Sequence, residues 1–307
     1  MDSVIITGGT GLIGKALSKY LVSRGYEVII LTRSPKEHKS FTPGITYAAW
    51  NIEEQSASEE AFQNAKYVIH LAGAGVADKA WTEKRKREIV ESRTRSSALL
   101  VKTINGIPNQ VASVVSASAI GWYGENPSGQ SVESEPPATD FLGETCRLWE
   151  NSIQPVEKQG RRLVILRTGI VLSNQGGAFP EFAKPIRFGI AGILGTGKQI
   201  ISWIHIEDLC RIYLEAMING SWTGVYNAVA PNPVSNKTFT LELAKKMKGR
   251  FFIQVPVPDF ILRLKLGDRS EEVLKSTNVS ANKLKQQGFQ FIFPTIDAAF
   301  RDLTQQD

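Results

Sequence analysis

The sequence predicts an α/β protein built on a doubly wound parallel sheet, and three observations lead to that fold class. Short apolar runs such as Val4–Ile6 and Val28–Leu31 have the length and composition of buried parallel strands. Segments with helical spacing separate these runs along the first 170 residues. A turn cornered by glycines joins the first run to the first helical segment. Together these features predict a Rossmann-type sheet followed by a smaller C-terminal substrate lobe.

The glycine turn is the first functional element. Gly8, Gly11 and Gly14 follow the first strand at three-residue spacing, and Gly25 ends the next helix. In such a unit the glycines permit a tight turn, close approach of a pyrophosphate, and packing of helix on strand. Free N–H groups at the helix start favour the phosphates. The alternative is a chance glycine turn. The residues expected at the cofactor are Thr7, Gly8, Thr10, Gly11, Leu12, Ile13 and Gly14.

The end of the second strand selects the cofactor. A carboxylate there usually binds the ribose 2′-hydroxyl of NAD, whereas arginine suits the 2′-phosphate of NADP. The residues are Thr32, Arg33 and Ser34, and the first acid is Glu37. Arg33 can donate forked hydrogen bonds to a phosphate. The sequence therefore favours NADP, the alternative being that Arg33 is a solvated loop charge.

Two further strand ends are expected at the nucleotide. Residues 45–50 read as a third strand that ends at Asn51, whose amide either contacts an adenine edge or forms a turn. Residues 67–71 read as a fourth strand that opens into small residues, which let backbone lie against a nucleotide. Leu71, Ala72 and Gly73 are therefore expected at the cofactor.

The alternation of strands and helices continues to about residue 170, and the sequence pattern then changes. We expect helices over 58–64, 82–104 and 140–159 and strands over 111–117 and 163–167. From about residue 170 glycines become more frequent, which indicates loops on the substrate side. A strand over 201–206 leads into a helix, another strand covers 225–228, and a final helix covers 296–303. The expected domains are an NADP-binding domain over 1–230, with substrate-side insertions from about 170, and a small α+β domain over 231–307.

Composition excludes several functional classes. The 307 residues carry a net charge of +6, and no apolar run is long enough for a membrane span. The first strand begins at once, which leaves no room for a signal peptide, and two cysteines make no disulfide framework. These features predict a cytoplasmic protein. The basic run 84–87 alternates with acids and reads as a solvated helix face, which disfavours nucleic acid. Three histidines without cysteine clusters predict no metal site.

Four motifs in order carry a family resemblance. They are Thr-Gly-Gly-Thr-Gly-Leu-Ile-Gly at 7–14, His-Leu-Ala-Gly at 70–73, Ser-Ala-Ser at 116–118 with Tyr123–Gly124, and Trp-Ile-His-Ile-Glu-Asp at 203–208. The chain resembles the extended short-chain dehydrogenase/reductases of the NAD(P)-dependent epimerase/dehydratase type. More narrowly, it is similar to an atypical subgroup, the epimerase family proteins of the 39U type, with a C-terminal domain of unknown function. The pieces 255–258, 266–267, 283–284 and 288–289 carry the narrower resemblance.

The resemblance implies a site whose usual catalytic pair is replaced. Members of the superfamily use a Tyr-x-x-x-Lys pair, in which the lysine lowers the tyrosine pKa and the tyrosine moves a proton. If Glu150 takes the usual glutamate position, the pair falls on Leu142 and Cys146. Ser118, or Ser116 in the other register, matches the serine that orients the substrate. Ser116 is also expected beside the cofactor.

Other residues are candidates for the missing roles, each with an alternative. Tyr123 is an acid/base candidate or a packed loop tyrosine. Cys146 is a nucleophile candidate or a buried inert thiol. His205 titrates near neutrality or caps the helix that follows it. Arg93, where the superfamily commonly has asparagine, binds a phosphate or carboxylate or makes a helix-surface salt bridge. The catalytic candidates are thus Ser118, Tyr123 and Cys146, and Arg93 joins the cofactor set.

Two functions follow from these residues. The first is an NADP-dependent oxidoreductase or epimerase-like enzyme acting on a small molecule, with nucleotide-linked and anionic compounds as candidates. The second is a non-catalytic NADP-binding redox sensor or scaffold, motivated by the loss of the tyrosine and lysine positions. Nucleic-acid binding through the run at Lys84 is the least favoured hypothesis, and a homodimer is a candidate assembly.

Overall fold

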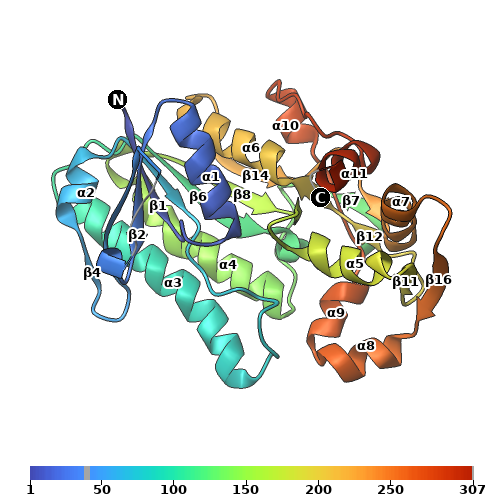
Figure 1. Ribbon diagram of the computed structural model, residues 1–307. Helices are drawn as coiled ribbons and strands as arrows, with labels where there is room; N and C mark the ends of the chain where they lie inside the picture. The colour runs from blue at the N-terminus through green and yellow to red at the C-terminus, as the bar shows by residue number, and fades with distance from the viewer. Residues whose placement is uncertain (38–41, 306–307) are drawn as a thin grey trace.

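The structure, a computed structural model that describes residues 1–37 and 42–305, confirms the Rossmann-type α/β fold (Figure 1). Among these residues, eight strands form the central sheet in the order β14-β8-β6-β5-β1-β2-β3-β4. Neighbours are parallel except for β3 and β4. The strands are β1 (Ser3–Thr7), β2 (Glu27–Thr32), β3 (Ile45–Asn51), β4 (Ser56–Ala57), β5 (Tyr67–His70), β6 (Ser113–Ala119), β8 (Arg162–Thr168) and β14 (Gly224–Ala228).

The position of β1 in the sheet creates a binding crevice. It pairs with β2 on one side and with β5 on the other, so the chain order reverses at β1. In open parallel sheets, ligands bind beyond the carboxyl ends of the strands at such a switch point. The turn after β1 and the loop after β5 therefore meet at the expected site.

Helices cover both faces of the sheet, as alternating side chains of β1 show. Val4 and Ile6 belong to one core cluster and Ile5 to a second. The first cluster takes residues from α1 (Leu12–Ser23) and α6 (Ile206–Ile218), and the second from α2 (Glu59–Asn64), α3 (Glu83–Gly106) and α4 (Phe141–Ile153). Side chains on both faces of β1 are thus buried under helices, as expected of a central parallel strand.

Several predicted elements differ from the observed ones at their ends. The helix expected over 140–159 stops at Ile153 and continues as the 3-10 helix η3 (Gln154–Gly160), where Pro155 has no N–H for the α-helical ladder. The strand expected over 201–206 divides into β12 (Ile200–Ile201) and β13 (Trp203–His205), which join different sheets. Ser202, between them, donates to the carbonyl of Thr277.

The remaining elements form the substrate side. Its strands are β7 (Asn126–Ser131), β9 (Ile170–Ser173), β10 (Gly176–Gly177), β11 (Ile190–Leu194), β15 (Val234–Ser235), β16 (Ile253–Val257) and β17 (Thr277–Val279). Its helices are η2 (Ile120–Tyr123), α5 (Ala178–Arg187), α7 (Asn236–Lys248), α8 (Asp259–Leu266), α9 (Arg269–Leu274), α10 (Asn282–Gln286) and α11 (Ile296–Gln305), and η1 (Pro35–Glu37) follows β2. Figure 1 shows α7 and β16 at the end of the molecule away from β2 and β4.

The C-terminal segment shares its core with the sheet domain. Phe239 of α7 and Phe300 of α11 belong to the cluster that includes Leu17 of α1. The buried Asp208 accepts the backbone N–H groups of Ile292 and Phe293 at 2.9 and 2.8 Å. In the described ranges, no helix has the length and apolarity to cross a membrane.

Candidate functional site

The glycines in the turn after β1 allow backbone segments to lie very close together. Gly8 has a φ of +69°, and a Cβ there would lie 2.9 Å from the carbonyl atoms of Leu71. A Cβ at Gly14 would lie 2.5 Å from the carbonyl oxygen of Gly8. The helix α1 starts at Leu12 with Gly11 as its N-cap, and among the described residues no side chain caps it. Its first N–H groups are therefore available to an anion.

The end of β1 is tied to the end of β5 by a buried threonine. The hydroxyl oxygen of Thr7 accepts the N–H groups of Leu71 and Ala72 at 3.1 and 3.2 Å. Ala72 and Gly73 follow directly and line a cavity. Thr7 is itself fully buried, so its role is to fix the backbone at this edge of the cavity.

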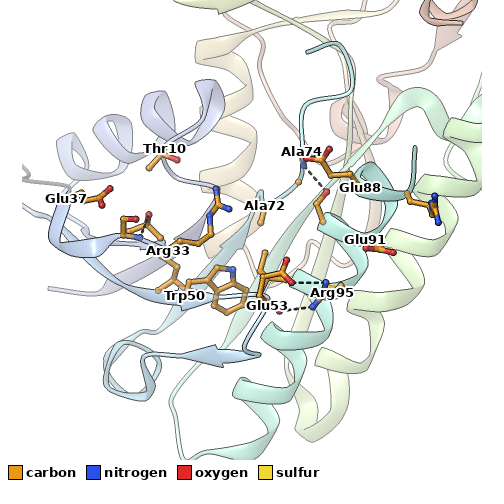
Figure 2. Close-up of a pocket in the computed structure, with 18 of the residues that line it drawn as sticks. Thr10, Arg33, Glu37, Trp50, Glu53, Ala72, Ala74, Glu88, Glu91 and Arg95 are labelled. Atoms are coloured by element: carbon orange, nitrogen blue, oxygen red, sulfur yellow. Dashed lines mark hydrogen bonds and ion pairs between the residues drawn. The ribbon is translucent and has the colours of Figure 1, made fainter. Parts of the chain in front are cut away.

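A cavity of about 760 Å³ lies beside the glycine turn (Figure 2). Five predicted cofactor residues line it: Gly8, Thr10, Arg33, Ala72 and Gly73. Figure 2 shows the side chain of Arg33 extending toward the middle of the cavity, whereas Glu37 lies at its edge. Of the other predicted cofactor residues, Gly11, Leu12, Ile13 and Gly14 belong to the turn and α1, and Leu71 backs Gly8.

The α3 side of the cavity is lined by charged side chains of both signs, with Glu88 and Glu91 beside the cations. Lys84 and Arg87, from the run interpreted as a solvated face, line it from α3. Neither makes an ion pair within residues 1–37 and 42–305, whereas Arg95, about two turns further along α3, contacts Glu53 at 3.4 Å. The available signal was position, because α3 follows the loop at the end of β5 and must border the crevice. Trp50, at the end of β3, forms another part of the wall.

Asn51 forms a turn, which is one of the two roles expected of it. Its side-chain oxygen accepts the N–H groups of Glu53 and Glu54 at 3.0 and 3.2 Å. The flanking residues Trp50 and Ile52 line the cavity. The amide oxygen of Asn51 therefore serves the turn after β3, and an adenine contact from this residue remains a prediction.

Arg93 is buried and, within the part of the chain that the structure describes, makes no salt bridge, so the helix-surface alternative is wrong. The side chain is 9% exposed, and its Nη1 donates to the carbonyls of Ala74 and Ile89 at 3.0 and 2.9 Å. The guanidinium lies over the ring of Trp149 at 4.9 Å. Burial lowers the pKa of Arg93. This residue supports the loop after β5 from beneath, since a Cβ at Gly73 would lie 3.2 Å from it.

Ser118 belongs to a buried polar network. Its hydroxyl donates to Oε1 of Glu150 at 2.7 Å, and Arg167 binds the same carboxylate with two nitrogens at 2.8 and 2.9 Å. A further nitrogen of Arg167 donates to the Tyr123 hydroxyl at 3.0 Å. That hydroxyl donates to Oδ1 of Asn227 at 2.5 Å. The network joins β6, α4, β8 and β14 at the carboxyl edge of the sheet.

Two of the three catalytic candidates have the structural roles given as their alternatives: Tyr123 is a packed tyrosine and Cys146 is a buried thiol. Burial raises the pKa of Tyr123 to about 12, and its proton is held by Asn227. Burial, with a contribution from the charge of Glu150, raises the pKa of the Cys146 thiol to about 11. A thiol with such a pKa is not a thiolate nucleophile at neutral pH. Both expected serines, Ser116 and Ser118, are buried in β6, and Ser118 also hydrogen-bonds Cys146.

Leu142 and Cys146, expected at the positions of the usual tyrosine and lysine, lie on the expected helix. Both lie on α4, Leu142 against Gly121 and Cys146 with its sulfur 3.7 Å from the carbonyl oxygen of Ala119. Both therefore face the segment that follows β6. Neither side chain replaces the missing acid/base group.

His205 caps the helix that follows it, which is the structural role given as its alternative. Its Nδ1 accepts the N–H of Glu207 at 3.2 Å, and its ring packs on Phe293 with centroids 3.8 Å apart. Its Nε2 lies 3.3 Å from a carboxylate oxygen of Asp302. Burial lowers the pKa of His205. Within the described residues, no group of three or more His, Cys, Asp or Glu side chains is placed to hold a metal ion.

Comparisons with known proteins match the whole chain. The model of the NAD dependent epimerase/dehydratase family matches residues 4–228, and a domain of unknown function, DUF1731, matches residues 257–303. The epimerase family protein SDR39U1 homolog, chloroplastic, of Arabidopsis thaliana is 33% identical over 99% of this chain and 87% of its own. Epimerase family protein SSP1921 of Staphylococcus saprophyticus is 36% identical over 99% of both chains. The crystal structure of human epimerase family protein SDR39U1 with NADPH superposes with a TM-score of 0.88, at 29% identity over 99% of both chains.

Proposed function

The chain belongs to the NAD dependent epimerase/dehydratase family, and from that premise we propose that it is an NADP(H)-binding oxidoreductase or epimerase-like enzyme. The observation that carries the proposal is the cavity at the glycine turn, which is lined by Arg33 and by two cations of α3. Arg33 comes from the end of β2, and Lys84 and Arg87 come from α3. An arginine at the end of the second strand suits the 2′-phosphate that NADP carries and NAD lacks.

The residues present fit such a dinucleotide. Side chains at Gly8 and Gly14 would collide with backbone, so the turn stays narrow where a pyrophosphate must approach. The uncapped start of α1 would hold the pyrophosphate, and Arg33 would hold the 2′-phosphate, with Lys84 and Arg87 adding positive charge to the same cavity. When bound, the nicotinamide supplies a hydride donor or acceptor.

The side chains near β6 and α4 define what this protein contributes to the chemistry. The hydroxyl of Ser118 donates a hydrogen bond to Glu150, so toward a substrate hydroxyl it would act only as an acceptor. Arg167 holds the same carboxylate with two nitrogens and so fixes the orientation of that serine. Tyr123 and Cys146 keep their protons at neutral pH, so neither would act as a base there.

The domain division and the setting are part of the same proposal. We assign residues 1–230 to NADP binding, with the glycine-rich insertions from about 170 facing the substrate, and 231–307 to a small α+β domain. The family matches to 4–228 and 257–303 support this division. The substrate is a small nucleotide-linked or anionic molecule. A cytoplasmic location is supported by two buried free cysteines, and a homodimer remains the candidate assembly.

The proposal is tested by following NADPH absorbance with the purified protein and a panel of carbonyl compounds and nucleotide sugars. We expect NADPH consumption with at least one member, reduced in Ser118→Ala. A protein that binds NADPH tightly and consumes none of it across the panel would contradict the enzymatic proposal. That outcome would favour the redox sensor or scaffold, which rests on the loss of the tyrosine and lysine positions.

A further inference from the structure

The loop after β5, residues 72–82, is held by an unusual run of contacts. Four consecutive carbonyl groups, those of residues 74–77, each accept a hydrogen bond from a side chain. The donors are Arg93 to Ala74 at 3.0 Å, Arg85 to Gly75 at 2.5 Å, Trp81 to Val76 at 2.8 Å and Arg269 to Ala77 at 2.6 Å. Successive carbonyls of an irregular loop usually bind water, so this loop has a fixed shape.

One end of this loop belongs to the cavity. Ala72, Gly73 and Ala74 line it, and Ser92 accepts the N–H of Ala74 at 2.9 Å. The loop then leads directly into α3, whose first turns carry Lys84 and Arg87. The shape of the loop therefore sets the position of the α3 side of the cavity.

The fourth donor comes from a distant part of the chain. Arg269 is 192 residues from Ala77 and opens α9, whereas the other three donors lie in the loop or on α3. A second contact beside it joins the same elements, with Asp268 3.4 Å from Nζ of Lys86 on α3. The segment at α9 thus touches both the far end of the loop and the helix that lines the cavity.

We propose that the C-terminal domain completes the dinucleotide site, with Arg269 as a positioning residue that holds the loop over residues 72–82. This inference rests on the proposed cofactor function. Without Arg269 the Ala77 carbonyl turns to solvent and the loop samples more conformations. Binding then has to pay the ordering entropy that the intact loop has already lost. The effect is weaker cofactor affinity without a change of any residue that lines the cavity.

The test compares Arg269→Ala with the wild type by calorimetric NADPH titration and by hydrogen exchange of loop amides. We expect about fivefold weaker binding, the effect of one lost hydrogen bond, and faster exchange over residues 75–80. Arg269→Lys keeps a donor and should recover most of both. Arg263→Ala removes an exposed cation from α8 and serves as the matched control. The melting temperature without ligand shows whether each variant is folded.

The outcomes separate this inference from the function on which it rests. Unchanged affinity and unchanged loop exchange in Arg269→Ala, with normal NADPH binding by the wild type, would overturn the positioning role alone. Wild-type protein that binds no NADPH would overturn the proposed function and the inference together. Weakening by Arg263→Ala as large as that by Arg269→Ala would also overturn it, because a general charge effect would then suffice.

Discussion

Nδ1 of His70 lies 2.8 Å from the hydroxyl oxygen of Thr7, and this contact fixes the imidazole tautomer. Both lone pairs of that oxygen are taken by the N–H groups of Leu71 and Ala72, so the hydroxyl proton points at Nδ1. Nε2 then carries the ring proton and faces the hydroxyl of Ser97 at 3.2 Å. The cavity edge is therefore supported by a neutral histidine that is completely buried.

Replacing Thr7 by valine should weaken both the fold and the cofactor site. The change keeps the shape of the side chain but leaves the N–H of Ala72 and Nδ1 of His70 without a partner, which costs about 1–3 kcal/mol. The N–H of Leu71 keeps its bond to the Thr7 backbone carbonyl. Urea denaturation measures that loss, and NADPH affinity should fall in parallel. Thr103→Val is the matched control, because its hydroxyl bonds only a carbonyl of its own helix. Equal stability of the two variants would contradict the role of Thr7.

His70 should make stability depend on pH on the acid side. Burial lowers its pKa from 6.5 to about 3, so the unfolded chain binds a proton that the folded protein excludes. Its contribution is fully present above pH 6.5 and is lost as pH falls toward 3, with a slope near 1.4 kcal/mol per pH unit (about one proton). Denaturation of wild type and His70→Asn between pH 7 and 5 measures it. A slope that survives in the variant would assign the effect to other groups.

The two cations of α3 should contribute to the choice of cofactor. Lys84→Gln with Arg87→Gln removes two charges from the cavity wall, and we expect NADPH affinity to fall about tenfold at low salt and less at high salt. NADH affinity should change little, because it lacks the 2′-phosphate. Lys102→Gln, on the same helix and outside the cavity lining, is the control. A loss that is equal for NADH and NADPH would show that the wall does not read this phosphate.

Cys146 should behave as an inert thiol in the folded protein. Its pKa of about 11 and its burial predict that iodoacetamide leaves it unmodified at pH 8, whereas unfolded protein is alkylated at both cysteines. Mass spectrometry of peptides from native and denatured samples measures the difference. Cys210 is buried too and has a pKa raised to about 12, so it provides an internal comparison. Rapid native labelling at Cys146 alone would restore it as a nucleophile candidate.

The sheet and the glycine turn could be predicted because local patterns determine them. The runs at Val4–Ile6 and Val28–Leu31 are buried on both sides, and Gly8 and Gly14 have no room for side chains. These requirements act over a few residues and leave a direct mark in the sequence. Element ends were less predictable, as at Pro155, where an apolar helical pattern continues past the last α-helical residue.

The site residues that could not be predicted depend on distant contacts. A charge run at Lys84 looks the same on a solvated face and on a cavity wall until α3 is placed beside the crevice. Tyr123 looked available because nothing local shows that Asn227, 104 residues away, takes its proton. Arg93 likewise required Trp149 and the loop carbonyls to be in place before its burial could be recognised.

The central claim is that the cavity at the glycine turn binds NADP(H) and that Arg33 recognises the 2′-phosphate. Calorimetric titration of wild type and Arg33→Ala with NADPH and NADH measures it most directly. The account predicts that wild type prefers NADPH and that the variant loses about tenfold or more of its NADPH affinity while NADH binding is unchanged. No heat with either nucleotide, or an Arg33→Ala variant that still prefers NADPH to the same degree, would contradict it.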